Sequence, residues 1–238
     1  LARMDRYKEI ARTLAYARDP DGGYGTILPE DEARALAQEG KAIIWIDGGL
    51  HATEVAHGQV MPEMAHYFVT DESAETQQIR ENTILLLMAN INPDGLNIVA
   101  DWYMSNVGTE FEMSRVPELY HHYIGHDNNR DGYMLNMVES RVLARTWQEW
   151  DPQIIYVHHQ SSPFPTRIWL PPFAEPIASF APPLMSRTVN TIGMTIAQEL
   201  DANGQPGAVH ALATYDAWYP GYVDYMPVYQ NIPAFWTE

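Results

Sequence analysis

The chain has 238 residues, of which 46% are hydrophobic and 19% charged, proportions typical of a folded globular protein rather than a disordered one. Its formal net charge of -17 disfavours general binding to nucleic acid or to an anionic membrane, because both are polyanions. The absence of cysteine excludes disulfides and thiolate metal sites, and no apolar run reaches the ~18 residues that a membrane span needs.

Helical and strand patterns alternate in the first part of the chain. Residues 4–19 place apolar side chains at helical spacing and end in a turn rich in proline and glycine. Residues 41–49 form a continuous apolar run closed by two glycines, as expected of a buried strand. Helical periodicity follows Glu54, and Pro62 predicts that this helix begins late or is kinked. Residues 82–95 predict a second buried strand that ends in a turn.

The same alternation continues in the second part of the chain. The segment 97–136 lacks strong periodicity and is too long for an idle connection, which indicates a functional loop. Two helices and three further strands are predicted after it, the helices at 137–150 and 184–201 and the strands at 152–160, 167–173 and 231–238. Helices alternating with strands buried on both faces indicate an α/β domain, in which a largely parallel central sheet carries helices on both faces.

Polar clusters follow three of these predicted strands. "HATE" (residues 51–54) comes after the first strand, "HHQ" (158–160) ends the third and "TE" (237–238) ends the last. Ligands of open α/β sheets gather at the carboxyl ends of strands, so these clusters are expected to lie near one another. Two ligands close in sequence and one remote ligand are typical of a catalytic zinc site. A surface turn with a chance histidine is the alternative interpretation of "HATE".

Five motifs in fixed order resemble the zinc carboxypeptidase (metallocarboxypeptidase) family. They are "HATE", "NINPDG", "DNNRD", "HHQ" and "NIPAFWTE", and the resemblance covers residues 41–238. The resemblance implies a zinc-carboxypeptidase-like fold, one Zn²⁺ per chain, and hydrolysis of a peptide bond next to a free C-terminal carboxylate. It also implies that residues 1–238 are a single catalytic domain, and a fragment that lacks an N-terminal strand and helix and a C-terminal helix.

The resemblance implies three metal ligands. His51 and Glu54 would be the first two, and a three-residue step on a helical turn puts both side chains on one side. The third would come from the histidine pair 158–159. We favour His159, because strand alternation puts His158 on the opposite face, where a packed or hydrogen-bonded histidine is expected.

The motif "DNNR" resembles the family's carboxylate-binding segment. Asn129 and Arg130 would hold the free carboxylate of the substrate, a role that suits the planar, bidentate guanidinium of arginine. Asp127 would accept a hydrogen bond from the other ring nitrogen of His51 and so fix its tautomer. A plain polar turn is the alternative interpretation of this stretch.

Glu238 matches the catalytic glutamate of the family. The resemblance implies that it is the general base that takes a proton from zinc-bound water. The charge that develops on the substrate carbonyl needs a cationic or metal partner, and Arg115 is the candidate for that role. A solvated surface charge is the alternative interpretation of Arg115.

The segment before Glu238 resembles the part of the family that contacts the substrate side chain. Alignment backward from Glu238 places Asp224 on a family aspartate and the substrate-capping tyrosine beside Tyr215, with Tyr219 as the alternative. Val223 would line the side-chain pocket, and its apolar character argues against a preference for C-terminal Lys or Arg. No role is assigned to the six remaining histidines, His57, His66, His121, His122, His126 and His210.

Several alternatives stay open on sequence alone. The substrate would be a peptide or amide with a free carboxylate, so a related zinc amidase or deacylase, or a cell-wall peptide hydrolase, fits the same motifs. A non-catalytic zinc-binding module and a structural α/β protein without metal are the further alternatives. The sequence gives neither the oligomeric state nor the compartment, and only analogy with the family slightly favours a secreted or periplasmic location.

Overall fold

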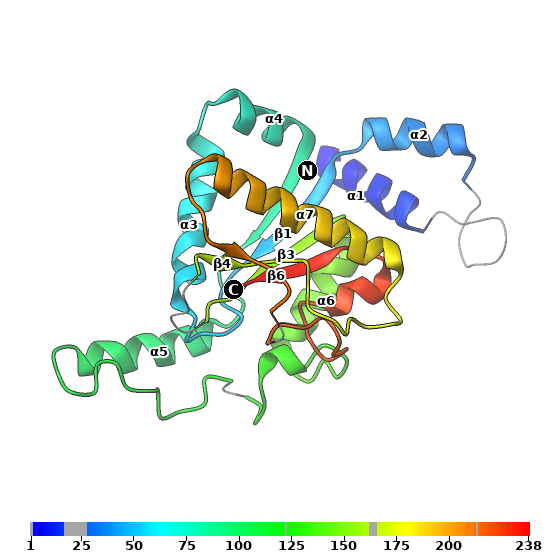
Figure 1. The fold of residues 1–238 in the computed structure, drawn as a ribbon. Coiled ribbons are helices and arrows are strands. Elements are labelled where there is room, and N and C mark those ends of the chain that lie inside the picture. The colour runs from blue at the N-terminus through cyan, green and yellow to red at the C-terminus, as the bar shows by residue number, and fades with distance from the viewer. Residues whose placement is uncertain (1, 17–27, 122, 162–165, 213) are drawn as a thin grey trace.

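The computed structural model describes residues 2–16, 28–121, 123–161, 166–212 and 214–238. Within this part of the chain, four strands form a central sheet in the order β2-β1-β3-β6, and all three neighbouring pairs run parallel (Figure 1). The strands are β1 (Ala42–Asp47), β2 (Thr83–Met88), β3 (Ile154–His158) and β6 (Ala234–Thr237). A separate pair is formed by β4 (Ile168–Trp169) and β5 (Ala208–Val209). The predicted α/β architecture is confirmed.

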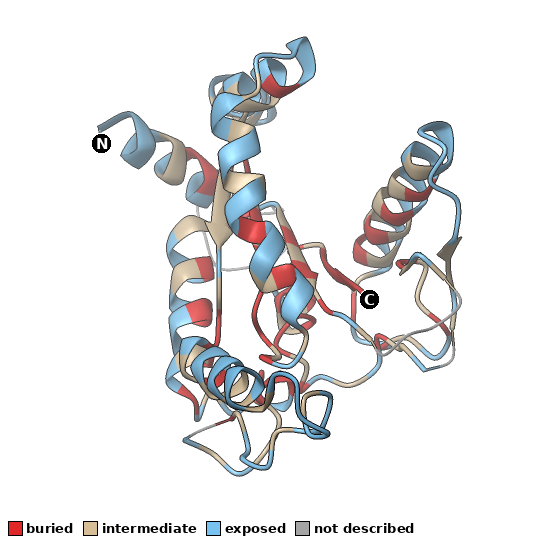
Figure 2. Ribbon diagram, turned by 90° about the vertical axis from the view of Figure 1, so that its left-hand side faces the viewer, coloured by how far each residue is buried: buried red, intermediate tan, exposed pale blue. Residues whose placement is uncertain are grey.

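Helices cover both faces of the sheet. In Figure 1, α7 lies in front of the strands, whereas α1 and α6 lie behind them. Figure 2 shows the buried residues concentrated in the strands and on the helix faces turned toward them. None of the helices in the described ranges is long and apolar enough to cross a membrane. The helices are α1 (Ala2–Ala15), α2 (Glu30–Glu39), α3 (Val55–Thr70), α4 (Ala74–Asn82), α5 (Pro93–Asn106), α6 (Val138–Trp150) and α7 (Pro183–Ala202), with two short 3₁₀ turns, η1 (Asn128–Arg130) and η2 (Met226–Gln230).

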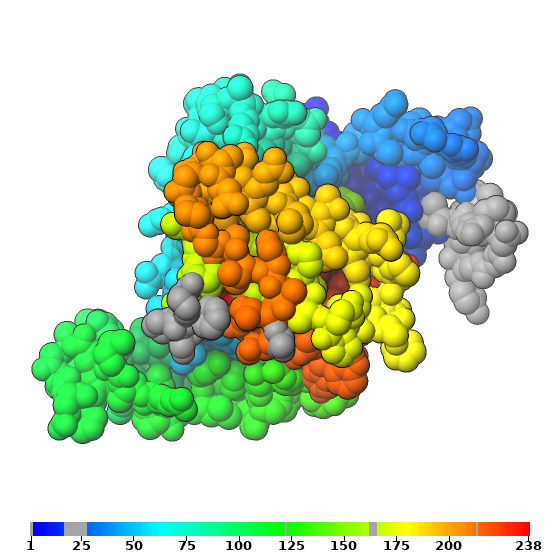
Figure 3. All heavy atoms as spheres, in the orientation of Figure 1, coloured from blue at the N-terminus to red at the C-terminus, as the bar shows by residue number. Residues whose placement is uncertain are grey.

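The predicted elements are confirmed where the hydrophobic pattern was strong, and three helices were not predicted. The helices α2 and α4 are short and polar, and α5 occupies the start of the segment predicted to be aperiodic. Helix α3 begins at Val55 and runs through Pro62, so of the two outcomes predicted from Pro62, a late start or a kink, the late start is wrong. The turn expected at 19–23 lies outside the described residues. Figure 3 shows α5 and the loop after it projecting from the body of the molecule.

The cap of α5 explains why it was missed. The Asn92 side chain accepts a hydrogen bond from the Gly95 N–H at 2.9 Å, and Pro93 occupies the first helical position. Both features favour a helix start. In the sequence, however, the same "NPDG" letters are also typical of a turn, which is how they were interpreted.

A tight turn at Gly49 follows β1 at the carboxyl edge of the sheet. Gly49 has φ +76°, and a Cβ on it would lie 2.1 Å from Asn90 Oδ1. The Gly49 N–H donates to His57 Nδ1 at 2.7 Å, which anchors the turn on α3. Glycine is required here because a side chain would meet both an unfavourable backbone conformation and its neighbour.

We therefore expect Gly49→Ala to lower the free energy of unfolding by about 2 kcal/mol or more. Gly58, inside α3, is the matched control because a Cβ there meets nothing within 4 Å. Gly58→Ala should leave stability unchanged or raise it by up to about 1 kcal/mol. Urea unfolding followed by circular dichroism measures both variants, and equal midpoints for the two would contradict this account of the turn.

Candidate metal centre

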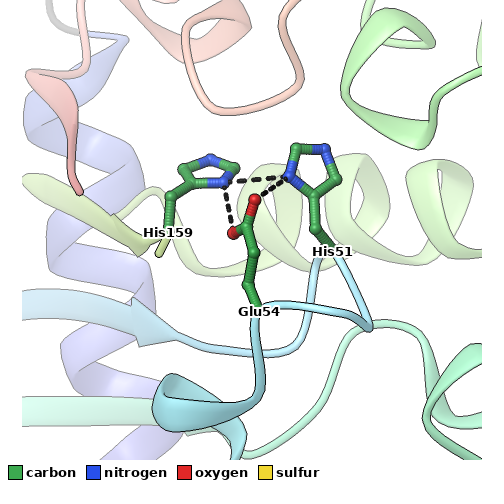
Figure 4. Close-up of side chains that lie close together, drawn as sticks. All are labelled: His51, Glu54 and His159. Carbon is green, nitrogen blue, oxygen red and sulfur yellow. Dashed lines mark hydrogen bonds and ion pairs between the residues drawn. The ribbon is translucent and has the colours of Figure 1, made fainter. Parts of the chain in front are cut away.

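Three side chains converge at the carboxyl edge of the sheet (Figure 4). His51 and Glu54 belong to the turn between β1 and α3, which is closed by a bond from the Glu54 N–H to the His51 carbonyl at 3.1 Å. His159 directly follows β3. Because β1 and β3 are neighbouring parallel strands, their carboxyl ends bring these residues together. One ligand atom from each of the three lies within 4.8 Å of the others.

The convergent atoms are two imidazole nitrogens and one carboxylate. Glu54 Oε1 lies 2.7 Å from His51 Nδ1, and Glu54 Oε2 lies 3.1 Å from His159 Nδ1. The two Nδ1 atoms are 3.2 Å apart. The Gln160 N–H, next along the chain, donates to Glu54 Oε2 at 3.0 Å and holds the carboxylate in place.

On the side of the ring away from Glu54, each imidazole is hydrogen-bonded to an aspartate. His51 Nε2 lies 3.0 Å from Asp127 Oδ1, and His159 Nε2 lies 2.7 Å from Asp224 Oδ2. A carboxylate accepts but does not donate, so the contacts with Asp127 and Asp224 place a proton on Nε2 of each ring. The Nδ1 atoms, which face Glu54, are then the ring atoms that could lose a proton and bind a metal, an arrangement typical of metal-binding histidines.

The electrostatics of the cluster favour positive charge. Burial opposes the imidazolium form of His51, but hydrogen bonds to Asp127 and Glu54 outweigh it and raise the pKa of His51 to about 9. Burial likewise opposes ionisation of Glu54, yet its bonds to the two imidazoles lower the pKa of Glu54 well below the usual range. Two imidazoles and a carboxylate without thiolates are ligands that zinc takes in catalytic sites, so the residues fit that metal.

The structure brings His159, and not His158, into this cluster. His158 Nδ1 instead lies 2.7 Å from the Asp47 carbonyl oxygen. Burial lowers the pKa of His158 to about 4, so this histidine is neutral at physiological pH. The alternation of the strand therefore separates the two neighbours as expected from their positions.

Asn129 and Arg130 lie beside the cluster, and a second segment holds them. The Asn129 amide donates to Asp224 Oδ2 at 2.9 Å and accepts from the Val223 N–H at 2.9 Å. The Arg130 guanidinium lies over the Tyr222 ring, 4.6 Å from its centroid. Both residues line a cavity of about 170 Å³ that also reaches His51, His159 and Glu238.

Glu238 stands at the end of β6 and faces the same cavity. Its backbone exchanges two hydrogen bonds with Trp169, at 3.0 and 2.9 Å, which fixes the main chain at this point. Its carboxylate accepts from Ser161 Oγ at 2.6 Å, and Ser161 also contacts the Tyr215 hydroxyl. Burial raises the pKa of Glu238 above its ordinary value.

Two of the residues predicted to act on the substrate, Arg115 and Val223, do not line this cavity. Arg115 is exposed on the loop after α5 and is not among the lining residues. Val223 is 2% exposed and its side chain belongs to the hydrophobic core, so only its backbone reaches the site, through Asn129. Tyr215 does line the cavity, and its ring packs 4.8 Å from that of Trp169. Tyr219, the alternative, is not among the lining residues.

Three residues with no predicted role hold the site in place. Asp224 supports His159, and Ser161 binds the Glu238 carboxylate. His57 is buried and links the turn to the cluster, because its Nδ1 accepts from Gly49 while its Nε2 lies 3.4 Å from Glu54 Oε2. The spacing of His57 three residues after Glu54 was a signal for this contact, since such pairs share one side of a helix.

Comparison with known proteins gives a family and a set of solved structures. The family model described as zinc carboxypeptidase matches residues 21–166. A search of curated proteins finds no match.

Solved structures of carboxypeptidases share the fold at low sequence identity. A Pseudomonas aeruginosa metallo-carboxypeptidase gives a TM-score of 0.59 at 16% identity, over 93% of this chain and 49% of that one. A Burkholderia cenocepacia metallo-carboxypeptidase gives a TM-score of 0.56 at 11% identity, over 89% of this chain and 50% of that one. A Helicoverpa armigera carboxypeptidase A gives a TM-score of 0.56 at 14% identity, over 98% of this chain and 70% of that one. The chain spans about half the length of the two bacterial enzymes.

Proposed function

The chain belongs to the zinc carboxypeptidase family, and we propose that it hydrolyses the peptide bond next to a free C-terminal carboxylate. One observation carries the proposal. The cavity beside the His51, Glu54 and His159 cluster is also lined by Arg130 and Glu238, so a candidate metal site, a cation that could bind a carboxylate and a half-buried carboxylate that could act as a base share one space.

His51, Glu54 and His159 would hold one Zn²⁺ per chain. When bound, zinc supplies Lewis-acid chemistry, since it polarises a carbonyl and makes a water molecule more acidic. The protein itself orients the side chains that would bind the metal. Asp127 and Asp224 keep the Nδ1 atoms of the two histidines turned inward.

Glu238 would act as the general base. Its carboxylate takes the proton of the attacking water and then passes it to the nitrogen of the departing C-terminal residue. The raised pKa of Glu238 suits this task, because a carboxylate that binds protons more readily is a stronger base. Ser161 orients the carboxylate through its 2.6 Å hydrogen bond.

Arg130 and Asn129 would bind the free carboxylate of the substrate. The guanidinium is partly exposed in the cavity and can donate two parallel hydrogen bonds. Tyr215 would cap the bound substrate, a role supported by its place on the cavity wall. The geometry gives no support to a carbonyl-polarising role for Arg115.

A turnover assay tests this function. Zinc-loaded protein should release the last residue of blocked dipeptides with free C-termini, and a chelator should stop the reaction. The same dipeptides with amidated C-termini should react at least a hundredfold more slowly, because Arg130 then has no carboxylate to bind. Zinc binding without turnover of any dipeptide would favour a non-catalytic binding module, and equal rates on amidated substrates would favour an amidase that ignores the carboxylate.

A separate measurement tests the support of His159. We expect Asp224→Asn to weaken zinc binding by about tenfold or more, because an amide holds the Nε2 proton less strongly than a carboxylate. Asp201→Asn, at an exposed position on α7, is the control and should leave zinc affinity unchanged. Competition with a chromophoric chelator measures both, and equal affinities for the two variants would contradict the role of Asp224.

A further inference from the structure

The Arg130 side chain lies against the ring of Tyr222, with its guanidinium carbon 4.6 Å from the ring centroid. Both residues line the cavity of about 170 Å³ beside the metal cluster. We infer that Tyr222 is a positioning residue, whose ring holds the Arg130 guanidinium in the orientation that binds the free carboxylate of the substrate. The inference rests on the proposed function and names the residue that sets how strongly a free carboxylate is preferred over a neutral C-terminus.

The contacts of Arg130 leave one edge of its guanidinium open for a ligand. Nη1 donates to the Asn129 carbonyl at 2.9 Å and lies 3.7 Å from Asp127 Oδ2. Among the described residues, none accepts a hydrogen bond from Nε or Nη2 of Arg130. The ring covers one face and Nη1 is bonded, so the edge formed by Nε and Nη2 remains. Two neighbouring N–H groups of this kind match a carboxylate bidentately.

Two hydrogen bonds join the segments that carry the stacked pair. The Gly132 N–H donates to the Gly221 carbonyl at 2.9 Å, and the Val223 N–H donates to Asn129 Oδ1 at 2.9 Å. Tyr222 stands between the two bonded positions of its own segment. A Cβ on Gly132 would lie 2.9 Å from the Tyr222 carbonyl oxygen, so the two backbones approach each other closely. The backbone of Tyr222 is therefore fixed opposite the arginine.

The Tyr222 ring is itself held by aromatic neighbours. Its centroid lies 5.3 Å from that of Tyr219, with 78° between the ring planes, and 5.9 Å from that of Trp236, with 61° between the planes. Trp236 is a buried residue of β6. Edge-to-face contacts of this kind are favourable and fix the orientation of a ring. Tyr222 therefore offers Arg130 a surface that does not have to be ordered when a ligand binds.

A fixed ring restrains a long and flexible arginine. The guanidinium is attracted to the aromatic face, which limits the rotamers that Arg130 samples before a ligand binds. Without the ring, the guanidinium is free to turn further toward the Asp127 carboxylate, which would then compete with that of the substrate. Loss of the ring should therefore weaken binding of a free carboxylate and leave binding of a neutral C-terminus unchanged.

Dipeptide binding to an inactive variant tests this role without turnover. In the zinc-loaded Glu238→Gln protein, calorimetry should show that N-acetyl-alanyl-alanine binds at least tenfold more tightly than its C-terminal amide. Adding Tyr222→Leu should reduce this ratio about fivefold or more, the scale of a lost cation–π contact, by weakening binding of the acid alone. Adding Tyr222→Phe instead should retain the ratio, because phenylalanine keeps an aromatic face.

Tyr229→Leu is the matched control. Tyr229 is a half-buried residue of η2 that contacts the ring of Tyr225 at 5.9 Å and does not line the cavity, so its replacement should retain the ratio. If Tyr222→Leu does not fold, Tyr222→Met takes its place, since the adaptable methionine side chain fills the space without offering an aromatic face.

The outcomes separate the inference from the function. A ratio that survives Tyr222→Leu, or that Tyr222→Phe or Tyr229→Leu lowers as much, would overturn the inference even if the wild-type protein hydrolyses the acid. A ratio near one with Tyr222 in place would also overturn it, because Arg130 would then not bind the carboxylate. A ratio lost in Tyr222→Leu alone would support the inference. If the wild-type protein then failed to hydrolyse N-acetyl-alanyl-alanine, the proposed hydrolysis and not the role of Tyr222 would be wrong.

Discussion

Replacing Glu238 by glutamine should lower kcat at least a hundredfold and leave the zinc content unchanged. Glutamine has nearly the same shape and its amide oxygen can still accept the hydrogen bond from Ser161, but it cannot take a proton. Loss of a general base typically costs a factor of ~10² to 10⁴ in rate. Single-turnover kinetics on a blocked dipeptide measure the rate, and atomic absorption measures the metal.

Glu199→Gln provides the control for this experiment. Glu199 is exposed on α7 and does not line the cavity, so its replacement removes the same charge outside the site and should change neither rate nor metal content. A Glu238→Gln protein that lost its zinc would show that Glu238 is a ligand rather than a base. A variant with full activity would remove Glu238 from the reaction altogether.

The second large effect concerns the third ligand. His159→Ala should weaken zinc binding by more than about a hundredfold, which exceeds the usual loss when a group that only supports a ligand is removed. His158→Ala should retain zinc, because the His158 ring bonds to the Asp47 carbonyl and not to the cluster. Equilibrium dialysis with zinc compares the two neighbours directly.

The stability of these two variants needs a parallel measurement. Both histidines are held by hydrogen bonds, so thermal unfolding of each metal-free variant should be recorded beside the zinc affinity. If both variants fold and only His158→Ala loses zinc, then His158 and not His159 is the third ligand. Loss from neither variant would remove the histidine pair from the site.

Much of the framework follows from the sequence because its strands are buried on both faces. The apolar runs at 41–49, 82–95 and 152–160 predict β1, β2 and β3, and parallel strands share one carboxyl edge. The position of His51 and Glu54 after one strand and His159 after its neighbour therefore predicts their proximity. The choice of His159 over His158 follows from the alternation of side chains along a strand.

The support that Asp224 and Ser161 give could not be predicted in the same way as that of Asp127. Asp224 and His159 are hydrogen-bonded although 65 positions separate them in the sequence, and Ser161 and Glu238 although 77 do. Contacts between residues so far apart produce no local sequence pattern. These contacts depend on how the segment before β6 folds back over the sheet. The same segment buries the Val223 side chain in the core, and only its N–H reaches Asn129, which no periodicity indicates.

Arg115 illustrates a different limit. The charge that develops on the substrate carbonyl needs a cationic or metal partner, and Arg115 is the candidate because it lies upstream of Arg130 in the loop. Its position depends on the path of the chain between α5 and η1. The described residues of that segment form neither helix nor strand, so the geometric constraint that regular structure provides is missing there. The structure leaves Arg115 exposed and away from the cavity lining.

Diffraction at the zinc absorption edge from crystals grown with zinc tests the central claim most directly. We expect one strong anomalous peak per chain, in contact with Nδ1 of His51, Nδ1 of His159 and the carboxylate of Glu54. A peak bound by other side chains, or no peak at this edge of the sheet in zinc-saturated crystals, would contradict it.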